Sequence, residues 1–288
     1  MAIWRLIDSG PGEAAWNMAA DEAIASTVRE GAAPPTLRLY GWTGPAVSLG
    51  SFQRFTDLDA HYCAARSIPV VRRPTGGRGI VHGDELTYSF SARNEGIFSS
   101  GLLDTYRKLG TAVIEALAML GLDVEMKRER EPGGVLTRSP LCFESASYGE
   151  VSSKGVKLVG SAQKRWQDGF LQQGSIPYAI DRELLEAVFN QQSAEGRGGR
   201  SNSEEDFRAG IHGLRKSVPD FDPELFKRFL KESFERTFGV TLAAALPSPR
   251  EEALARALLR EKYQDPEWTE KRVEQGRSCG SSETPRRA

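Results

Sequence analysis

Residues 150–180 constrain the fold most, because they place three strand-like runs in direct succession. The stretch reads EVSSKGVKLVGSAQKRWQDGFLQQGSIPYAI, with a Ser-Lys-Gly turn after the first run and an Asp168-Gly169 turn after the second. Glycine-containing turns of this kind between strand-like runs are typical of antiparallel hairpins. The segment therefore predicts a β-meander, and with it a sheet that is largely antiparallel.

Strand and helix patterns alternate before this meander, and helical patterns dominate after it. Strand-like runs fall at residues 3–10, 36–42, 46–52, 68–73 and 85–92. Helical patterns fall at residues 14–31, 57–67, 102–121, 181–190, 222–239 and 250–263. We therefore expect an α/β (α+β) fold, in which helices flank a mixed, largely antiparallel sheet and a small helical C-terminal portion follows.

The expected domain organisation follows the change of character at Arg182. The main domain covers residues 1–190, a polar loop 191–210, the helical C-terminal portion 211–273 and a disordered tail 274–288. The loop contains SAEGRGGRSNSEED and the tail contains EQGRSCGSSETPRRA. Both are too polar and too rich in glycine or serine to form packed structure.

Composition excludes several classes of protein. The 288 residues are 39% hydrophobic, which is enough for a core, and they carry a formal net charge of −1. No run approaches the ~18 consecutive apolar residues of a membrane helix. The three cysteines form no Cys-x-x-Cys or Cys/His cluster, so neither a disulfide framework nor a metal site is indicated. We expect a cytoplasmic globular protein with no membrane or nucleic-acid partner, and a monomer by default.

A glycine-rich, charged stretch lies at residues 71–90. Its sequence, VRRPTGGRGIVHGDELTYSF, sets a glycine turn, three arginines and a histidine between two apolar runs. Bare backbone in such a turn can contact a small acyl or phosphoryl ligand. The spacing is neither that of a phosphate-binding P-loop nor that of a dinucleotide fingerprint. The sequence predicts a ligand-binding turn here, and the plain alternative is a hairpin turn.

A second stretch, residues 141–178, supplies the reactive side chains. It contains Cys142, Lys157 on a predicted strand and another turn of small residues. Taken alone, Cys142 is a small buried hydrophobe and Lys157 is an exposed strand residue. Together with the glycine turn they indicate an acyl-transfer site, because a thiolate can carry an acyl group as a thioester.

Five motifs follow one another in an order typical of one family. They are NMAADEA at 17–23, RRPTGGRGIVH at 72–82, ELTYS at 85–89, KLVGSAQKR at 157–165 and LQQGSI at 171–176. On these motifs, over the first two-thirds of its length, the chain resembles the lipoate-protein ligase and octanoyltransferase family, a branch of the biotin protein ligase-like fold. LCFES around Cys142 is similar to the members that use a cysteine nucleophile. Many members have His-Asp where this chain has His82-Gly83.

The resemblance implies an octanoyltransferase of lipoate biosynthesis, with residues 1–190 as its catalytic domain. Octanoyl would pass from octanoyl-acyl carrier protein to Cys142, and then to a lysine of a lipoyl domain. Glycine cleavage H protein and the E2 subunits of 2-oxoacid dehydrogenases carry such domains. Because one thioester replaces another and amide formation runs downhill, no cofactor is expected and ATP is not required.

The predicted catalytic residues are Cys142, Lys157 and His82. Cys142 reacts as a thiolate, so a nearby cation must lower the pKa of its thiol or a base must take its proton. Lys157 is the candidate cation, and His82 can order the loop or shuttle a proton. Which of the two activates Cys142 stays open.

The remaining predicted site residues are chosen for shape and charge. Gly76 and Gly77 can take positive φ and turn N–H groups toward an acyl carbonyl, and small residues leave room for a linear chain. The predicted substrate-binding residues are Arg72, Arg73, Gly76, Gly77, Arg78, Gly160, Ser161, Ala162, Gln163 and Gly174. The expected docking patch for acidic partner proteins comprises Arg72, Arg73, Arg78, Lys154, Lys164 and Arg165, and the alternative is a solvated rim of charged residues.

Three alternatives stay open. In an ATP- and Mg²⁺-dependent lipoate-protein ligase with a lipoyl-adenylate intermediate, Lys157 would hold the activated carbonyl and Cys142 would be incidental. A non-catalytic acyl-binding or biotin-like ligand-binding protein could use the same fold. A relative that moves octanoyl between two lipoyl domains also uses a cysteine, but its glycine turn is less similar to RRxTGGR.

Overall fold

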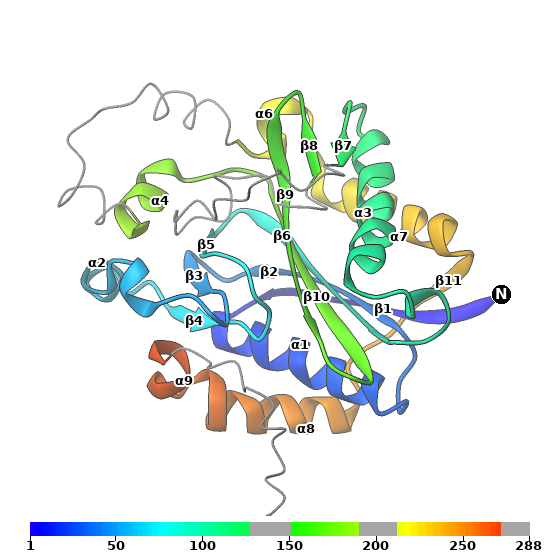
Figure 1. The fold of residues 1–288 in the computed structure, drawn as a ribbon. Coiled ribbons are helices and arrows are strands. Elements are labelled where there is room, and N and C mark those ends of the chain that lie inside the picture. The colour runs from blue at the N-terminus through cyan, green and yellow to red at the C-terminus, as the bar shows by residue number, and fades with distance from the viewer. Residues whose placement is uncertain (127–150, 190–211, 272–288) are drawn as a thin grey trace, which may run out of the picture.

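The computed structural model describes residues 1–126, 151–189 and 212–271 (Figure 1). Its main sheet has eight strands in the order β11-β1-β2-β6-β10-β9-β8-β7. The bounds are β11 Val240–Ala244, β1 Ala2–Gly12, β2 Thr36–Trp42, β6 Glu85–Arg93, β10 Gly169–Pro177, β9 Val156–Arg165, β8 Val151–Ser153 and β7 Glu125–Met126. All pairings from β2 to β7 are antiparallel, and β1 pairs in parallel with β2 and β11. The predicted mixed, largely antiparallel sheet is confirmed.

The predicted meander is present as β8, β9 and β10. The turn between β8 and β9 has positive φ at Lys154 (48°) and Gly155 (80°). Two successive residues with positive φ are the geometry of a tight two-residue hairpin, which matches the twist of the strands it joins. The Ser-Lys-Gly signal therefore marked the turn correctly.

The C-terminal portion contributes a strand that the sequence prediction missed. Helix α7 (Pro223–Phe238) ends at Gly239, whose φ of 63° turns the chain back, and β11 then pairs with β1. Val240 and Leu242 are buried while their neighbours in the strand are exposed. The strand has only five residues and follows a strong helical pattern, so its alternation was too short to be recognised as a strand in the sequence. The helical portion is thus joined to the main sheet.

The glycine turn belongs to a second, three-stranded sheet of order β4-β3-β5. These strands are β3 Ala46–Leu49, β4 Val70–Arg72 and β5 Ile80–His82. β4 pairs with β3 in parallel and β5 pairs with β3 in antiparallel fashion. The turn therefore crosses over β3 and joins strands that are not neighbours, so the alternative of a plain hairpin is wrong. The short helices η1 (Phe55–Asp57), α2 (Ala60–Ala65) and α4 (Arg182–Phe189) accompany this sheet.

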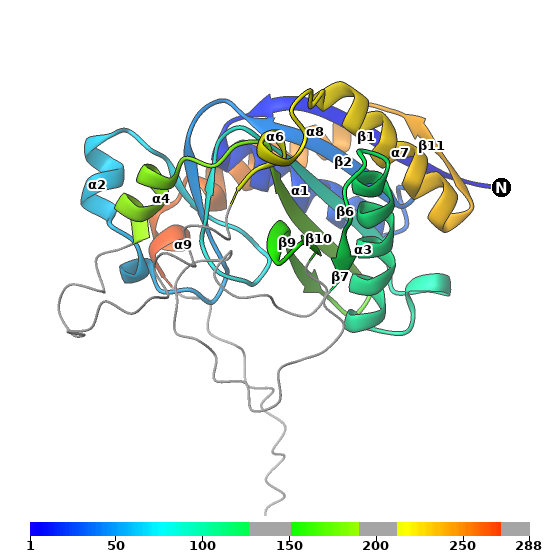
Figure 2. The same cartoon turned by 90° about the horizontal axis from the view of Figure 1, so that it is seen from above.

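Helices cover both faces of the main sheet (Figures 1 and 2). On one face, α3 (Leu102–Ala118) and α7 pack over a large apolar cluster, with the short elements η2 (Gly96–Phe98) and α6 (Leu214–Ser217) at its margins. On the other face lies α1 (Ala14–Arg29), which is followed outward by α8 (Pro249–Leu258). The predicted helices at 14–31, 102–121 and 222–239 are confirmed, each with a glycine of positive φ at its end.

The chain returns to the N-terminal half through its last described helices. α8 continues as a π-helical turn, η4 (Leu259–Tyr263), and α9 (Pro266–Glu270) then reaches β4. Arg5 on β1 forms an ion pair with the buried Glu251 of α8, and Lys262 pairs with Glu22 of α1. The helical C-terminal portion is packed against the main domain.

Several predictions fall outside the described residues. These are the whole polar loop at 191–210, the tail at 274–288, and Cys142. The predicted domain boundaries stay predictions. Among the described residues, no helix combines the length and the apolar character needed to cross a membrane.

Candidate functional site

A narrow cavity lies on the α1 face of the main sheet, where the two sheets meet. It is lined by Met18, Tyr40, Trp42, Arg73, Ile80, His82, Thr87, Gly160, Ser161, Ala162, Gln173, Gly174 and Ser175. Six predicted site residues are among them: Arg73, His82, Gly160, Ser161, Ala162 and Gly174. The structure thus brings the glycine-rich stretch and the meander together, as the acyl-transfer hypothesis requires.

The cavity floor is formed by two paired strands, and the residues that β9 contributes to it are small. Gly160 and Ala162 on β9 lie opposite Ser175 and Gln173 on β10. A side chain at Gly174 would collide with the Tyr88 ring, since a Cβ atom there would lie 2.1 Å from a ring carbon. Gly174 is therefore required by packing on the α3 side, and it contributes backbone to the cavity.

The glycine turn lies over this floor. Gly77 has a φ of +87°, and a Cβ there would lie 2.8 Å from Nη2 of Arg73 and 3.4 Å from Cβ of Ala162. A side chain at Gly77 would therefore be strained and crowded. Gly76 does not have positive φ, so that part of the prediction is wrong, and a Cβ at Gly76 would meet open space.

Arg73 holds the turn from within. Its Nη2 donates to the carbonyl oxygens of Gly76 (2.9 Å) and Arg78 (2.7 Å). Its Nη1 donates to the carbonyl oxygen and the Oγ of Ser48, at 2.9 and 3.0 Å. Arg73 is buried and lines the cavity. Its guanidinium therefore shapes the turn at the same place where it can meet a ligand.

Arg72 has a different function from its neighbour. Its side chain is fully buried, and it donates to the carbonyl oxygens of Gly50, Gln53 and Thr269. Trp268 returns a hydrogen bond from its indole nitrogen to the carbonyl oxygen of Arg72. Arg72 therefore fastens α9 to β4, and it does not line the cavity described above.

The structure contradicts the expected docking patch. Arg72 and Arg73 are buried and cannot present charge to a partner protein. Lys154 precedes β9 and Lys164 lies near its far end, so at ~3.3 Å per residue they are roughly 30 Å apart. Arg165 donates to Thr105 and to the carbonyl oxygen of Phe98 instead of projecting freely. These six cations do not form one surface.

His82 is held between two polar partners. Its Nε2 lies 2.7 Å from Ser48 Oγ, its Nδ1 lies 3.0 Å from Glu85 Oε1, and its ring stacks on Trp42 at 3.7 Å. Burial alone would raise the pKa of Glu85, but the adjacent His82 and the hydroxyl of Thr87 lower it overall. Glu85, three residues further along the chain, thus supplies a buried carboxylate to His82.

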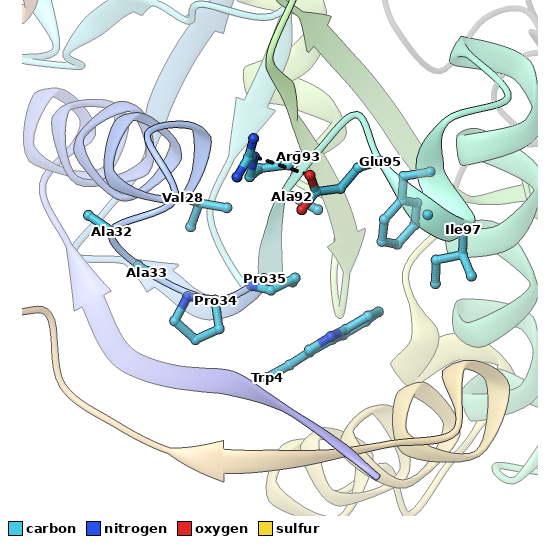
Figure 3. A pocket seen from close by; sticks show the side chains of 13 residues that line it. Trp4, Val28, Ala32, Ala33, Pro34, Pro35, Ala92, Arg93, Glu95 and Ile97 are labelled. Atoms are coloured by element: carbon cyan, nitrogen blue, oxygen red, sulfur yellow. Dashed lines mark ion pairs between the residues drawn. The ribbon is translucent and has the colours of Figure 1, made fainter.

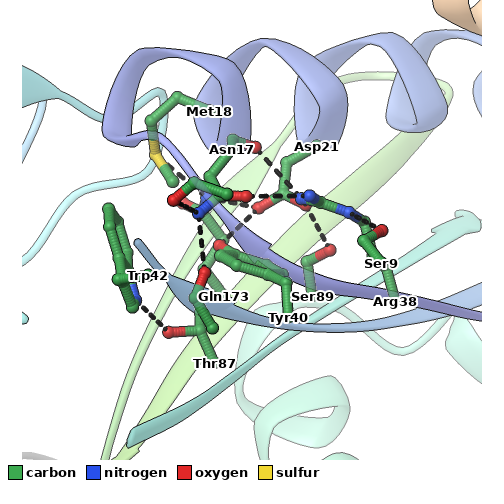
Figure 4. Close-up of polar contacts among 12 residues, drawn as sticks. Ser9, Asn17, Met18, Asp21, Arg38, Tyr40, Trp42, Thr87, Ser89 and Gln173 are labelled. Atoms are coloured by element: carbon green, nitrogen blue, oxygen red, sulfur yellow. Dashed lines mark hydrogen bonds and ion pairs between the residues drawn. The ribbon is translucent and has the colours of Figure 1, made fainter. Parts of the chain in front are cut away.

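A second polar network lies beneath the cavity, between α1 and the sheet (Figure 4). The carboxylate of Asp21 accepts hydrogen bonds from Arg38 (2.7 Å), Ser89 (2.6 Å) and Gln173 (2.8 Å). Gln173 Oε1 in turn accepts from the hydroxyl of Thr75 at 2.7 Å, directly before the glycine turn. The hydroxyl of Tyr40 is the fourth donor to Asp21. Because Asp21 and Arg38 are fully buried and paired, this network is a rigid support for the turn.

Sequence reasoning missed several cavity residues. They are Met18, Tyr40, Trp42, Ile80, Thr87, Gln173 and Ser175. Met18 and Gln173 lie inside the motifs NMAADEA and LQQGSI. They were missed because the site residues were chosen for small size or for charge. Tyr40 and Trp42 alternate on β2, and nothing in the sequence says which face of that strand carries the cavity.

Lys157 reaches the cavity side of β9 through a β-bulge. The pairing of β8 with β9 shifts register next to Lys157. Leu158 and Val159 both pack into the apolar cluster under α3, so alternation is broken between them. Lys157 faces away from Leu158, and Gly160 faces away from Val159. Lys157 and Gly160 therefore share the face that carries the cavity, and Lys157 is buried there.

The positions of the other predicted residues say less about the site. Cys142 lies outside the described residues, so its distance to Lys157 and His82 stays untested. Gln163 bonds Gln172 on the neighbouring strand, and Arg78 is half-buried in the glycine turn. Cys63 is buried in α2, and burial, followed by the charge of Asp59, raises the pKa of its thiol. Cys63 is a structural cysteine of low reactivity.

A larger hollow of about 430 Å³ lies at the other end of β6 (Figure 3). It is lined by Trp4, Val28, Gly31, Ala32, Ala33, Pro34, Pro35, Ala92, Arg93, Glu95, Gly96, Ile97 and Phe98. None of the predicted site residues that the structure describes lies there. The convergence of buried polar groups, and not volume, identifies the smaller cavity as the site.

Comparison with known proteins places the chain in one family. The model of the lipoyl protein ligase A/B catalytic domain matches residues 13–235, and the chain belongs to this family. Its curated relatives include proteins named octanoyltransferase LipM. Those of Halalkalibacterium halodurans and Kyrpidia tusciae are 35% and 37% identical over 93% of this chain, and over 99% and 98% of their own lengths. That of Moorella thermoacetica is 41% identical over 66% of this chain and 70% of its own.

Solved structures share the fold. Lipoate-protein ligase A bound with ATP superposes with a TM-score of 0.75 at 24% identity, covering 94% of this chain and 99% of its own. A bipartite lipoate protein ligase from Thermoplasma acidophilum gives a TM-score of 0.75 at 23% identity, covering 96% and 99%. The expected lipoate ligase-like fold is confirmed.

Proposed function

We propose that the protein is an octanoyltransferase of lipoate biosynthesis that carries octanoyl as a thioester of Cys142. The donor is octanoyl-acyl carrier protein, the acceptor is a lysine of a lipoyl domain, and neither ATP nor another cofactor takes part. The near-full-length similarity to octanoyltransferases carries this proposal. The cavity supports it as a place for a linear acyl chain, because Gly160 and Ala162 leave its floor open beneath the glycine turn.

The reaction is two acyl exchanges. In the first, the Cys142 thiol gives up its proton, the thiolate attacks the donor carbonyl, the bond to the carrier sulfur breaks, and the carrier leaves as a thiol after taking up that proton. In the second, the acceptor amine attacks the Cys142 thioester, an amide forms, and the Cys142 thiol is released. Lys157, buried on the cavity face, is the cation we assign to stabilising the thiolate and the developing oxyanion.

The cavity must widen to receive the acyl chain. It measures about 20 Å³ as it stands, room for about one water molecule. Met18 lines it, and unbranched methionine adapts most easily to a new shape. Each methylene that enters contributes about 0.8 kcal/mol of burial. The affinity for the acyl group should therefore rise with the length of the acyl chain until the cavity can widen no further.

Lipoyl domains are the acceptors that we propose. The Thermoplasma ligase has been solved in a study of that enzyme and its E2 lipoyl domain, which supports the same acceptor class here. Glycine cleavage H protein and E2 subunits are the specific candidates. Cytoplasmic localisation and a monomeric state complete the proposal.

The test is transfer without nucleotide. Purified protein, octanoyl-acyl carrier protein and an apo lipoyl domain are incubated without ATP, and the mass of the lipoyl domain is recorded. A gain of one octanoyl group on its lysine is expected. Modification that requires free lipoate, ATP and Mg²⁺ would contradict the proposal and favour a ligase. Binding of octanoate, with no modification of the lipoyl domain either from octanoyl-acyl carrier protein or from lipoate with ATP, would favour a binding protein.

A further inference from the structure

The hydrogen bonds around His82 determine what that side chain can do. Arginine can only donate, so Ser48 Oγ accepts from Arg73 Nη1 at 3.0 Å. The hydroxyl hydrogen of Ser48 is then available to His82 Nε2, which lies 2.7 Å away. His82 Nδ1 carries the proton that is donated to Glu85 at 3.0 Å. Both ring nitrogens are therefore occupied by buried partners.

A histidine in this state has no nitrogen left for a reacting thiol. Its ring face is also covered on one side by Trp42, at a centroid distance of 3.7 Å. The same bonds form a continuous line from the carboxylate of Glu85 through His82 and Ser48 to the guanidinium of Arg73. That line ends at the carbonyl oxygens of Gly76 and Arg78.

We propose that His82 is a positioning residue that acts through Ser48 on Arg73, and that this line sets the direction of the peptide groups in the glycine turn. The inference rests on the proposed function only in assigning those peptides to the acyl carbonyl. In a trans peptide the N–H points opposite to the C=O. With the Gly76 carbonyl held by Arg73, the N–H of the same peptide group, that of Gly77, points away from the guanidinium, and it is the donor that we assign to the acyl carbonyl.

The first test needs no substrate. Amide hydrogen exchange is measured by mass spectrometry on the peptide that spans residues 74–82, in the wild type and in Ser48→Ala and His82→Gln. We expect the turn amides to exchange several-fold faster in both variants and at the wild-type rate in Ser48→Thr, which keeps a hydroxyl. Ser91→Ala is the matched control, because Ser91 is equally buried and lies on β6 away from the turn. Unchanged exchange in both variants would overturn the inference, whatever the protein catalyses.

The second test separates positioning from proton transfer. Octanoyl transfer by Ser48→Ala and by His82→Gln should each lose about tenfold to a hundredfold in kcat, with the KM for donor much less affected. The double variant should lose no more than the larger single loss, since both changes cut one line. Multiplied losses in the double variant would contradict the inference.

Alkylation of Cys142 by iodoacetamide provides the third readout. If His82 were the base for Cys142, His82→Gln would slow alkylation at neutral pH, whereas Ser48→Ala would not. We expect wild-type alkylation rates in both variants, and a His82→Gln-specific loss would overturn the inference. A wild type that alkylates normally but forms no octanoyl adduct would refute the proposed function, and the exchange result would still stand.

Discussion

The two faces of the main sheet are built from the same strands but do different work. Toward α3 and α7, alternate residues such as Leu37, Leu39 and Phe90 join one apolar cluster. Toward α1, the intervening residues are polar, among them Arg38 on β2 and Ser89 on β6. Period-two alternation separates a face that stabilises from a face that presents chemistry.

The difference teaches how the site can be polar and still rigid. Buried polar groups are costly unless every one of them has a partner. On the α1 face the Asp21 and His82 networks provide those partners and end at the glycine turn from two sides. Burial of the apolar face stabilises the fold, so the α1 face can carry polar groups that serve the site. Changes on the two faces should therefore have distinct signatures.

Asp21→Ala should have the largest effect of the substitutions on these two faces. It leaves the Arg38 guanidinium, 1% exposed, without its carboxylate. Breaking a buried ion pair costs about 3–5 kcal/mol, which should appear in the free energy of unfolding by urea. Asp21→Asn, which keeps the shape, should lose less. Wild-type stability in Asp21→Ala would show that the α1 face does not depend on this pair.

Leu39→Ala tests the opposite face. Truncation at this fully buried position should lower the free energy of unfolding by about 3 kcal/mol, through lost burial and a cavity. The kcat of the folded protein should stay near the wild-type value. A kcat loss as large as that of a turn variant would erase the distinction between the faces.

Thr75→Val sharpens the comparison at the site itself. The substitution keeps the shape and removes the hydroxyl that binds Gln173, so it should cost about 1–2 kcal/mol of stability. We expect kcat to fall about tenfold, because the glycine turn loses one of its supports. Thr75→Ser, which keeps the donor, is the control and should retain most of the activity. Equal losses in both variants would contradict the role assigned to the hydroxyl, since Thr75→Ser keeps it.

Acidification should lower the free energy of unfolding by less than the substitutions above, through a carboxylate on the α1 side. Burial alone would raise the pKa of Glu251, but the hydrogen bonds from Arg5 and Thr27 lower it from 4.5 to about 2. Because the folded-state pKa lies below the unfolded one, the stabilisation is present above pH 4.5 and is lost as pH falls toward 2. We expect a contribution of about 1 kcal/mol, after allowing for solvent screening. Glu251→Gln should lack this part of the pH dependence, and an unchanged pH profile would refute it.

The sequence predicted the parts of the fold that depend on local pattern. The meander carried its own turn chemistry at Gly155 and Asp168, and the helices ended at glycines such as Gly239. β11 was missed because its five residues gain their structure from pairing with β1, which is a tertiary contact. The order β4-β3-β5 was hidden for the same reason.

The site could be predicted only where residue type decides the role. Gly77 and Ala162 were chosen for lack of bulk, and the structure places them against each other. Arg72 and Arg73 were indistinguishable as adjacent arginines, yet one fastens α9 and the other supports the turn. Charge in a sequence does not reveal burial, which is why the docking patch was wrong.

The central claim is that Cys142 carries the acyl group, and peptide mapping tests it most directly. The protein is incubated with octanoyl-acyl carrier protein without ATP, quenched and digested, and each cysteine peptide is weighed. We predict one octanoyl group on the Cys142 peptide, its disappearance when apo lipoyl domain is added, and full activity in the Cys63→Ala control. Transfer at the wild-type rate by Cys142→Ala would contradict the account.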